Sequence, residues 1–277
     1  MILIADSGST KTHWCIVDGV GIKTELFTEG INPFFQSEDE IAGQLNIHLL
    51  PKLTDFPIDE IHYYGAGCAF AAQKQLLRNA FNAHFSDASI HVESDLTAAA
   101  RSLFNKRQGI ACILGTGSNS CLYDGEKIVA NISPLGFILG DEGSAAVLGR
   151  QLVADCLKNQ LPDGLRGKFL EKFHLTPQLI LDKVYKNPFP NRFLAGLSVF
   201  LKENIEYQAM YDIVYGGFKS FFIRNVMQYP LEGEKIGFVG STAYHYRDIL
   251  EKVAVDLGLS IDRIVQNPMQ GLVKYHV

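Results

Sequence analysis

The chain begins with an acid and a group of small, hydroxyl-bearing residues that stand where a buried strand should end. Its first residues read MILIADSGSTKTHWCIV, in which the apolar run Ile2–Ala5 predicts a short strand that reaches Asp6. Backbone N–H groups and hydroxyls of the turn Ser7–Thr10 can converge on an anion, and Gly8 permits a backbone conformation that other residues resist. The turn could therefore hold phosphate groups, although a plain tight turn between two strands would have the same sequence.

This turn differs from the two best-known phosphate-binding loops. A P-loop requires the pattern G-x-x-x-x-G-K-[ST] before a helix, whereas here the alternating residues THWCIV predict a second strand. The dinucleotide-binding pattern G-x-G-x-x-G requires a third glycine, and this turn has none at the required position. A second small-residue turn, LGTGSNS at Leu114–Ser120, again follows a buried strand, and a third, FVGSTA at Phe238–Ala243, stands between a strand and a helix. Two hairpins of this kind facing each other across a cleft could hold the polyphosphate of a nucleotide from both sides.

The elements that must position these turns form a pattern that occurs twice. After an opening meander of three strands, the sequence predicts a helix over Glu38–Leu50, the strand EIHYYG, the helix FAAQKQLLRNAFNAHF, the strand SIHV and a helix over Asp95–Phe104. The segment IACILGTGSNSCLYDGEKIVANIS then restarts with strand, turn and strand, which indicates an internal duplication. We therefore expect an α/β fold with two lobes, residues 1–108 and 109–277, with a cleft between them and a boundary within NKRQG.

The second lobe is expected to carry an inserted helical segment. Residues from 143 to about 230 predict mainly helices, broken at LPDG and at NPFPN. The strand KIGFVG, a helix over Tyr244–Leu257 and a short C-terminal tail are expected to complete the lobe. Two apolar helical stretches, FLAGLSVFL and FKSFFIRNV, could form a homodimer contact, but packing within the lobe explains them as well.

The composition bounds the class of protein. The 277 residues are 47% hydrophobic and 20% charged, with a formal net charge of −5, and Lys and Arg form neither a run nor a stripe. We therefore expect small-molecule partners and no nucleic-acid surface. The N-terminal residues lack the basic start and long apolar stretch of a secretory signal, and no apolar window is long enough to span a membrane. A cytoplasmic protein with no membrane partner is the resulting expectation.

Cysteine and histidine give no sign of a disulfide or of a transition-metal motif. The five cysteines are odd in number and scattered among apolar neighbours, which favours reduced thiols in the core. The eight histidines show no metal-ligand spacing such as H-E-x-x-H, and we expect them at the surface or behind other site residues.

Taken together, four motifs resemble those of one superfamily. DSGSTKT, GTGSNS, GDEGS and VGSTA occur in order over nearly the whole chain and resemble segments of the acetate and sugar kinase, heat-shock protein 70 and actin superfamily. Within it they are similar to the branch that holds the BadF/BadG/BcrA/BcrD-type ATPases and eukaryotic-type N-acetylglucosamine kinase. The resemblance implies two ribonuclease-H-like lobes, ATP and Mg²⁺ as cofactors, and transfer of the γ-phosphoryl group to a hydroxyl of an amino sugar.

Phosphoryl transfer needs a cradle for the phosphates, a cation and a carboxylate that orients the attacking hydroxyl. Asp6, at a strand end beside the first turn, suits a largely water-mediated Mg²⁺ site, because Mg²⁺ prefers oxygen ligands; a cap or turn acid is the alternative. Ser9 and Thr10 would donate hydrogen bonds to phosphate oxygens. Lys11 could add charge at the γ-phosphate or could lie solvated in the second strand.

Asp95 is the candidate general base. It follows the strand SIHVES and opens the helix LTAAARSLF, so it stands at a helix N-terminus, where the family places its catalytic aspartate. The same position suits a simple N-cap, and the residues alone leave both roles open.

The resemblance also implies positions on the sugar and nucleotide sides. In N-acetylglucosamine kinase the segments that correspond to GINPFF and PLGFILGDEGSAA hold the sugar, and the matching residues are Asn32, Ser118, Asn119, Gly136 and Asp141. The positions that match ATP contacts are Gly8, Gly115, Thr116, Gly240 and Ser241. Asp141 and Glu142 could equally be first-turn acids that favour the helix dipole. The first turn departs from the family, which commonly has glycine where this chain has Ser7 and Ser9.

Two other functions stay open at this stage. Some members of the branch are ATPases that drive electron transfer into a partner enzyme and bridge an iron-sulfur cluster between subunits, but Cys68 and Cys112 do not recreate the cluster-binding loops. A nucleotide-responsive regulatory module is the third hypothesis, although the related repressors carry a helix-turn-helix before the first turn, which is expected here at residue 6. An ATP-dependent amino-sugar kinase is the preferred hypothesis.

Overall fold

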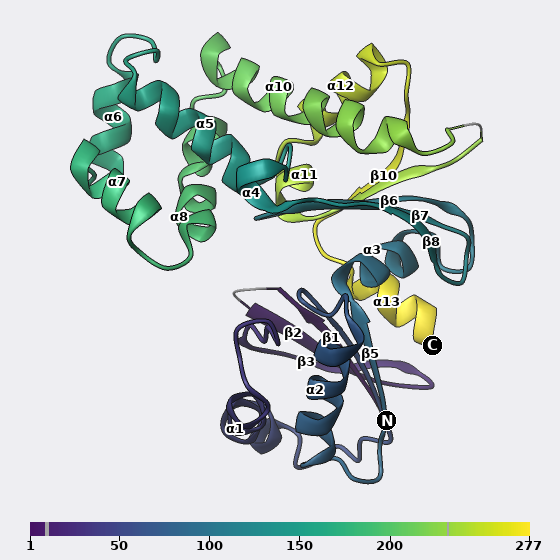
Figure 1. Cartoon of the computed structure of the whole chain (residues 1–277). Coiled ribbons are helices and arrows are strands. Elements are labelled where there is room, and N and C mark those ends of the chain that lie inside the picture. The colour runs from purple at the N-terminus through teal and green to yellow at the C-terminus, as the bar shows by residue number, and fades with distance from the viewer. Residues whose placement is uncertain (9–10, 232) are drawn as a thin grey trace. The chain divides into compact units, whose positions relative to one another are not determined.

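The computed structural model describes residues 1–8, 11–231 and 233–277, which divide into two compact units (Figure 1). The first unit holds Met1–Arg107, Gly125–Lys127 and Asn267–Val277, and the second holds Gln108–Asp124 and Ile128–Gln266. The chain therefore leaves the first unit within the expected boundary segment NKRQG and returns to it at Asn267. The C-terminal residues, which we expected as a tail of the second lobe, belong instead to the first unit.

The first unit is built on a five-stranded mixed sheet with the order β3-β2-β1-β4-β5. β1 pairs antiparallel with β2, and β2 with β3, as the predicted meander requires, whereas β1–β4 and β4–β5 are parallel pairs. The strands are β1 (Ile2–Ser7), β2 (Lys11–Asp18), β3 (Gly21–Glu29), β4 (Glu60–Gly65) and β5 (Ser89–Ser94).

Helices cover both faces of this sheet, because successive residues of a strand point to opposite sides. Leu3 and Ala5 pack with α1 and α2, whereas Ile4 packs with α3 and α13. Gly271 permits the close approach of α13 to α3, since a Cβ atom there would lie 2.3 Å from the carbonyl oxygen of Ser102. The helices are α1 (Glu38–His48), α2 (Ala71–Asn82), α3 (Asp95–Phe104) and α13 (Met269–His276), with a 3-10 helix at Leu50–Lys52.

The second unit repeats the same sheet. Its strand order is β10-β9-β6-β7-β8, in which β6–β7 and β7–β8 are antiparallel and β6–β9 and β9–β10 are parallel. Read from the meander edge, both sheets have the same succession of antiparallel and parallel pairs, so the predicted duplication and the two ribonuclease-H-like lobes are confirmed. The strands are β6 (Gly109–Leu114), β7 (Ser118–Tyr123), β8 (Ile128–Ile132), β9 (Ile236–Val239) and β10 (Ile261–Val265).

A helical insertion stands between β8 and β9, as predicted (Figure 1). The breaks fall where LPDG and NPFPN stand, between α5 and α6 and between α7 and α8. The apolar stretches considered for a dimer contact place Leu194, Leu197, Phe218 and Phe221 in the core of the unit itself. The inserted helices are α4 (Gly136–Leu139), α5 (Ala145–Leu157), α6 (Leu165–Lys172), α7 (Pro177–Tyr185), α8 (Pro190–Leu197), α9 (Val199–Glu203) and α10 (Gln208–Arg224), followed by a 3-10 helix at Val226–Gln228.

The end of the chain holds more structure than the sequence indicated. The predicted helix over Tyr244–Leu257 is split into α11 (Ser241–His245) and α12 (Arg247–Asp256), and the expected tail forms the strand β10 and the helix α13. β10 is an edge strand in which Ile264 alone is buried, so its residues show little of the apolar pattern that marks a strand.

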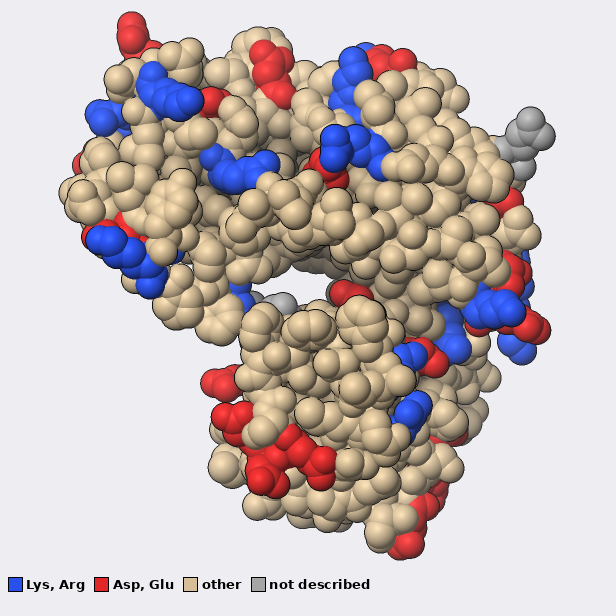
Figure 2. All heavy atoms as spheres, viewed as in Figure 1, with Lys and Arg blue, Asp and Glu red and all other residues tan. Residues whose placement is uncertain are grey.

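The core agrees with the expectation for the cysteines. All five cysteines are buried. Among the described residues, no helix is long and apolar enough to cross a membrane. On the face shown in Figure 2, Lys and Arg side chains are scattered over each unit, and acidic side chains gather over α1, whose first turn contains Glu38, Asp39 and Glu40.

Candidate functional site

The parallel strands of the first unit bring two acids to one edge of the sheet. Ser7 of β1, Gly65 of β4 and Ser94 of β5 lie in register, so the strands end together. Asp6 precedes this line on β1, and Asp95 follows it as the first residue of α3. The carboxyl ends of parallel strands are the usual place for ligands in such sheets.

Asp6 is electrostatically perturbed. Burial, and then the neighbouring carboxylate of Asp95, raise the pKa of Asp6 to about 7. Among the described residues, no side chain or turn N–H donates a hydrogen bond to the Asp6 carboxylate. A carboxylate with this environment fits a cation ligand, because bound Mg²⁺ would relieve the repulsion and replace the missing donors.

Asp95 is held at the start of α3 without serving as its cap. The N-cap is Ser94, whose Oγ accepts a hydrogen bond of 3.2 Å from the N–H of Thr97. Asp95 Oδ1 accepts a hydrogen bond of 2.8 Å from the N–H of Leu96, which leaves Oδ2 for another partner. Burial raises the pKa of Asp95, and the backbone N–H groups at the helix start oppose that rise. Ser94, which sequence reasoning missed, therefore supplies the capping that was considered for Asp95.

Ser7, the first residue of the first small-residue turn, uses its hydroxyl group for hydrogen bonds within the protein. Ser7 is buried, and its Oγ lies 2.7 Å from Thr12 Oγ1 and 3.1 Å from both the N–H nitrogen and the carbonyl oxygen of Ile31. The exposed Gly8 donates its N–H to the carbonyl of Lys11, which closes the turn. Ser9 and Thr10, predicted as phosphate ligands, lie outside the described residues.

Lys11 lies at the beginning of β2 and is exposed. Its ammonium group is 3.6 Å from the centre of the Phe27 ring on β3, which is a cation–π arrangement. The sequence left two roles for Lys11, a solvated place on the second strand and added charge at the γ-phosphate, and this contact does not decide between them.

Asn32 lies close to the turn that follows β4. Its Oδ1 accepts a hydrogen bond of 3.0 Å from the N–H of Phe34, and its own N–H donates to Gln36 Oε1. Gly67 has a φ of +81°, and a Cβ atom there would lie 2.4 Å from Asn32 Oδ1. Ser7 and Tyr63 both hydrogen-bond to the preceding residue, Ile31, so the loop that carries Asn32 is fixed to the strand ends.

In the second unit, the structure brings the second and third small-residue turns together. The hydroxyl of Thr242 in α11 donates a hydrogen bond of 3.0 Å to the carbonyl oxygen of Gly115. Gly240 has a φ of +129°, and a Cβ atom there would lie 2.2 Å from the carbonyl oxygen of Leu114, so only glycine permits this approach. Thr116 is exposed beside these contacts, and Ser241 begins α11.

Asp141 belongs to the same region of the second unit. Its Oδ1 accepts a hydrogen bond of 3.1 Å from the N–H of Ser118, and its backbone has a φ of +52°. Burial raises the pKa of Asp141, and the hydrogen bond from Ser118 acts in the opposite direction. Asp141 thus contacts the β6–β7 turn and lies before the N-cap of α5, which is Ser144.

The next acid, Glu142, points to a different partner. It forms an ion pair with Arg224 at the end of α10 and accepts a hydrogen bond of 3.3 Å from Asn225 Nδ2. The two adjacent acids therefore have different partners: Asp141 contacts the start of β7, whereas Glu142 contacts residues at the end of α10.

Asn119 and Gly136 are the remaining residues predicted for the sugar. Asn119 Oδ1 accepts hydrogen bonds of 2.9 Å from the N–H of Ser120 and 3.0 Å from Asn131 Nδ2, which ties β7 to β8. Gly136 begins α4 with a φ of +73°, directly after Leu135 at a φ of 60°.

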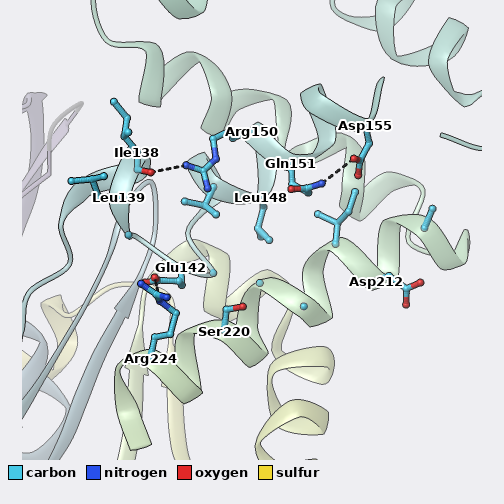
Figure 3. A pocket seen from close by; sticks show the side chains of 17 residues that line it. Ile138, Leu139, Glu142, Leu148, Arg150, Gln151, Asp155, Asp212, Ser220 and Arg224 are labelled. Carbon is cyan, nitrogen blue, oxygen red and sulfur yellow. Dashed lines mark hydrogen bonds and ion pairs between the residues drawn. The ribbon is translucent and has the colours of Figure 1, made fainter. Parts of the chain in front are cut away.

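A cavity of about 740 Å³ lies between α4, α5 and α10 (Figure 3). The Glu142–Arg224 pair lies on one side of it, and Arg150 reaches from α5 to the carbonyl oxygens at the end of α4. None of the residues predicted to bind nucleotide or sugar lines this cavity. Ile138, Leu139 and Gly140, within the segment PLGFILGDEGSAA, do line it, so the cavity borders the segment expected to hold the sugar.

Comparison with solved structures gives matches over the whole chain. A "Putative N-acetylglucosamine Kinase" from Porphyromonas gingivalis is 46% identical, covers 100% of this chain and 98% of its own, and superimposes with a TM-score of 0.96. A second protein so described, from Chromobacterium violaceum, is 15% identical with coverage of 99% and 98% and a TM-score of 0.71. A ROK family glucokinase from Streptomyces griseus, in complex with glucose and AMPPNP, is 15% identical with coverage of 99% and 97% and a TM-score of 0.56.

The last two similarities show the shared fold alone, whereas the first extends to the sequence. A scan against protein-family models and a search of the curated proteins gave no match. With 46% identity over its full length to the Porphyromonas gingivalis protein, the chain belongs to the N-acetylglucosamine kinase branch of the BadF/BadG/BcrA/BcrD-type ATPase family, within the sugar kinase, heat-shock protein 70 and actin superfamily.

Proposed function

We propose that this protein is an ATP-dependent kinase that phosphorylates a hydroxyl of an amino sugar, N-acetylglucosamine or a close relative. The observation that carries the proposal is the 46% identity, over the whole chain, to the Porphyromonas gingivalis protein described as a "Putative N-acetylglucosamine Kinase". The paired acids at the end of β1 and the start of α3 support it, because phosphoryl transfer requires a cation site and a base.

Asp95 is proposed as the general base. Its Oδ1 is occupied by the N–H of Leu96, so Oδ2 would accept the proton of the attacking sugar hydroxyl. The sugar oxygen then forms a bond to the γ-phosphorus, the bond from this phosphorus to the bridging oxygen breaks, and ADP leaves. A pKa raised by burial favours this step, since a base works best when its pKa approaches the working pH.

The other residues would bind and orient. Asp6 would hold Mg²⁺, which when bound supplies positive charge to the phosphate oxygens. Asn32, Ser118, Asn119, Gly136 and Asp141 would receive the sugar hydroxyls and the amide group. The nucleotide would contact the glycine-rich turns, whose members are Gly8, Ser9, Thr10, Lys11, Gly115, Thr116, Gly240 and Ser241.

The test is ADP release from Mg²⁺-ATP in the presence of a panel of hexoses and N-acetylhexosamines. We expect one N-acetylhexosamine to stimulate turnover, and Asp95→Asn to lower the stimulated rate by about 10²- to 10⁴-fold, because general-base catalysis contributes that much. Asparagine keeps an oxygen for the N–H of Leu96, so the variant should fold. Asp39→Asn is the matched control, since Asp39 is an exposed acid in the first turn of α1.

Two outcomes would contradict the proposal. Slow ATP hydrolysis that is indifferent to every sugar would favour an ATPase coupled to a protein partner. Sugar-stimulated turnover that Asp95→Asn leaves intact would keep the kinase but remove Asp95 as its base.

A further inference from the structure

Three side chains of the first unit, outside the site described above, point their ligand atoms at one another. Glu60 and His62 stand two residues apart on β4 and therefore share a face of the sheet. His91 on β5 lies in register with His62. The carboxylate oxygen Oε1 of Glu60 is 2.9 Å from His62 Nε2 and 3.3 Å from His91 Nε2, and all three ligand atoms lie within 4.8 Å of one another.

These distances suit a transition-metal ion. Ligand atoms about 2.0–2.1 Å from a tetrahedral Zn²⁺ lie about 3.3 Å apart. The two distances from Glu60 Oε1, 2.9 Å and 3.3 Å, are close to that spacing, and the half-exposed His91 ring stacks on the ring of His62 with centres 4.8 Å apart. Two imidazoles with one carboxylate are a donor set typical of Zn²⁺ rather than of Mg²⁺.

We propose that Glu60, His62 and His91 form a binding site for a divalent transition-metal ion of the Zn²⁺ type, with water in the fourth position. The site would join the start of β4 to the edge strand β5. No other group of three His, Cys, Asp or Glu ligands with this spacing was found in residues 1–8, 11–231 and 233–277.

The surroundings support a built site rather than a chance surface contact. The ring of His276, from α13, lies 3.7 Å from the ring of His62, and its Nε2 is 2.9 Å from the hydroxyl of Tyr64. His62 is 12% exposed, so its imidazole is held between β5 and the C-terminal helix. The guanidinium of Arg101 donates a hydrogen bond of 2.8 Å to the Tyr64 hydroxyl and lies over the ring of Tyr275, and its positive charge still acts on His62.

The proposed ion is separate from the kinase site. Glu60 pairs with Ile2 at the beginning of β1, whereas Asp6 lies four residues further along that strand. His62 pairs with Ile4, two residues before Asp6, so at about 3.3 Å per residue the proposed ligands lie roughly 7–13 Å from Asp6 along the sheet. The proposal therefore does not depend on the proposed function, and metal binding can be measured in the absence of nucleotide and sugar.

The test is a titration of the full-length chain, without an affinity tag and after treatment with a chelator, with Zn²⁺ and with Co²⁺. We expect one equivalent of Zn²⁺ to bind, and Co²⁺ to give the visible d–d bands of a site with nitrogen and oxygen ligands and no thiolate charge-transfer band. His62→Gln combined with His91→Gln should weaken binding by more than about tenfold, since even outer-shell changes cost that much.

The matched control is His13→Gln. His13 also pairs with a glutamate, at 2.7 Å from Glu25 Oε2, but no third ligand joins the pair in the part of the chain that the structure describes, so this variant should bind as the unchanged chain does. If the double variant folds poorly, His91→Gln alone provides the test, because His91 is exposed on an edge strand. Binding of less than half an equivalent, equal binding by the His91 variant, or a thiolate band from Co²⁺ would overturn the proposal.

Discussion

Replacing Ser7 by alanine tests whether the first small-residue turn holds phosphate or holds the neighbouring loop. Of the Thr12 and Ile31 groups that hydrogen-bond to Ser7 Oγ, two keep other partners, because Thr12 Oγ1 donates to the carbonyl of Glu29 at 3.1 Å and the Ile31 carbonyl accepts from Tyr63 at 3.1 Å. The N–H of Ile31 is the group that loses its partner. A buried donor left unsatisfied costs about 1–3 kcal/mol, which is the expected loss in the free energy of unfolding of the first unit.

Urea unfolding followed by tryptophan fluorescence measures this loss directly. Trp14, the single tryptophan, is buried in the first unit, so its emission reports that unit alone. Because Ile31 precedes Asn32, Ser7→Ala should also raise the KM for the sugar more than the KM for ATP. Ser89→Ala is the matched control, since Ser89 is an exposed serine in the same sheet.

The result that would refute this reasoning is specific. A change in unfolding free energy below about 0.5 kcal/mol, the range of neutral surface substitutions, together with a raised KM for ATP, would mean that Ser7 serves the nucleotide. The family glycine at this position can be tested in the same way. Ser7→Gly should cost about 0.5–1 kcal/mol more than alanine, because glycine loses more backbone freedom on folding.

Three further predictions concern other residues of the candidate site. Gly240→Ala should destabilise the second unit and weaken ATP binding in a nucleotide titration, because the added Cβ would lie 2.2 Å from the Leu114 carbonyl oxygen; unchanged binding would contradict the role of this turn. Asp141→Asn should raise the KM for the sugar at least about tenfold, whereas Glu142→Gln, at an acid that pairs with α10, should change it less than about twofold. The stability of the first unit should fall as pH rises between 3.8 and about 7, since folded Asp6 binds its proton more tightly than the unfolded chain does. Asp6→Asn should flatten this dependence in urea unfolding without Mg²⁺, and an equal slope in both proteins would contradict the raised pKa.

Much of the fold could be predicted because short sequence patterns indicate its strands, helices and turns. Buried strands such as IACIL and EIHYYG, the Asp18–Gly19 hairpin and the breaks at LPDG and NPFPN all carry strong short-range signals. β10 lacks such a signal, because an edge strand with polar residues is stabilised by its neighbour rather than by burial of alternate side chains. The return of α13 to the first unit depends on contacts between residues far apart in sequence, such as Gly271 with Ser102, and no local pattern records them.

Prediction of the site from the sequence was limited in the same way, because the roles of single residues depend on contacts that no local pattern reveals. Asp95 was found by its place at a helix start, but the sequence could not separate catalysis from capping, since Ser94 stands beside it and can cap equally well. Gly67 and Thr242 were missed because their importance lies in how closely the backbone approaches Asn32 and Gly115. Glu60, His62 and His91 show no linear metal motif, because the ligands come together through the register of two parallel strands.

The duplicated sheets also differ in a way that bears on the mechanism. β1 ends in Asp6 and Ser7, whereas β6, at the equivalent place in the second sheet, ends in the apolar residues Ile113 and Leu114. Leu114 is fully buried and offers no carboxylate to a cation. The turn that follows it instead presents backbone groups, which Thr242 and the start of α5 hold in place. One of the duplicated sheets thus has the acids that a cation and a base require, and the other has the glycine-rich backbone that suits a nucleotide. A substitution that places an acid at Leu114 would bury a carboxylate without a partner. It should therefore disrupt folding rather than create a second catalytic centre.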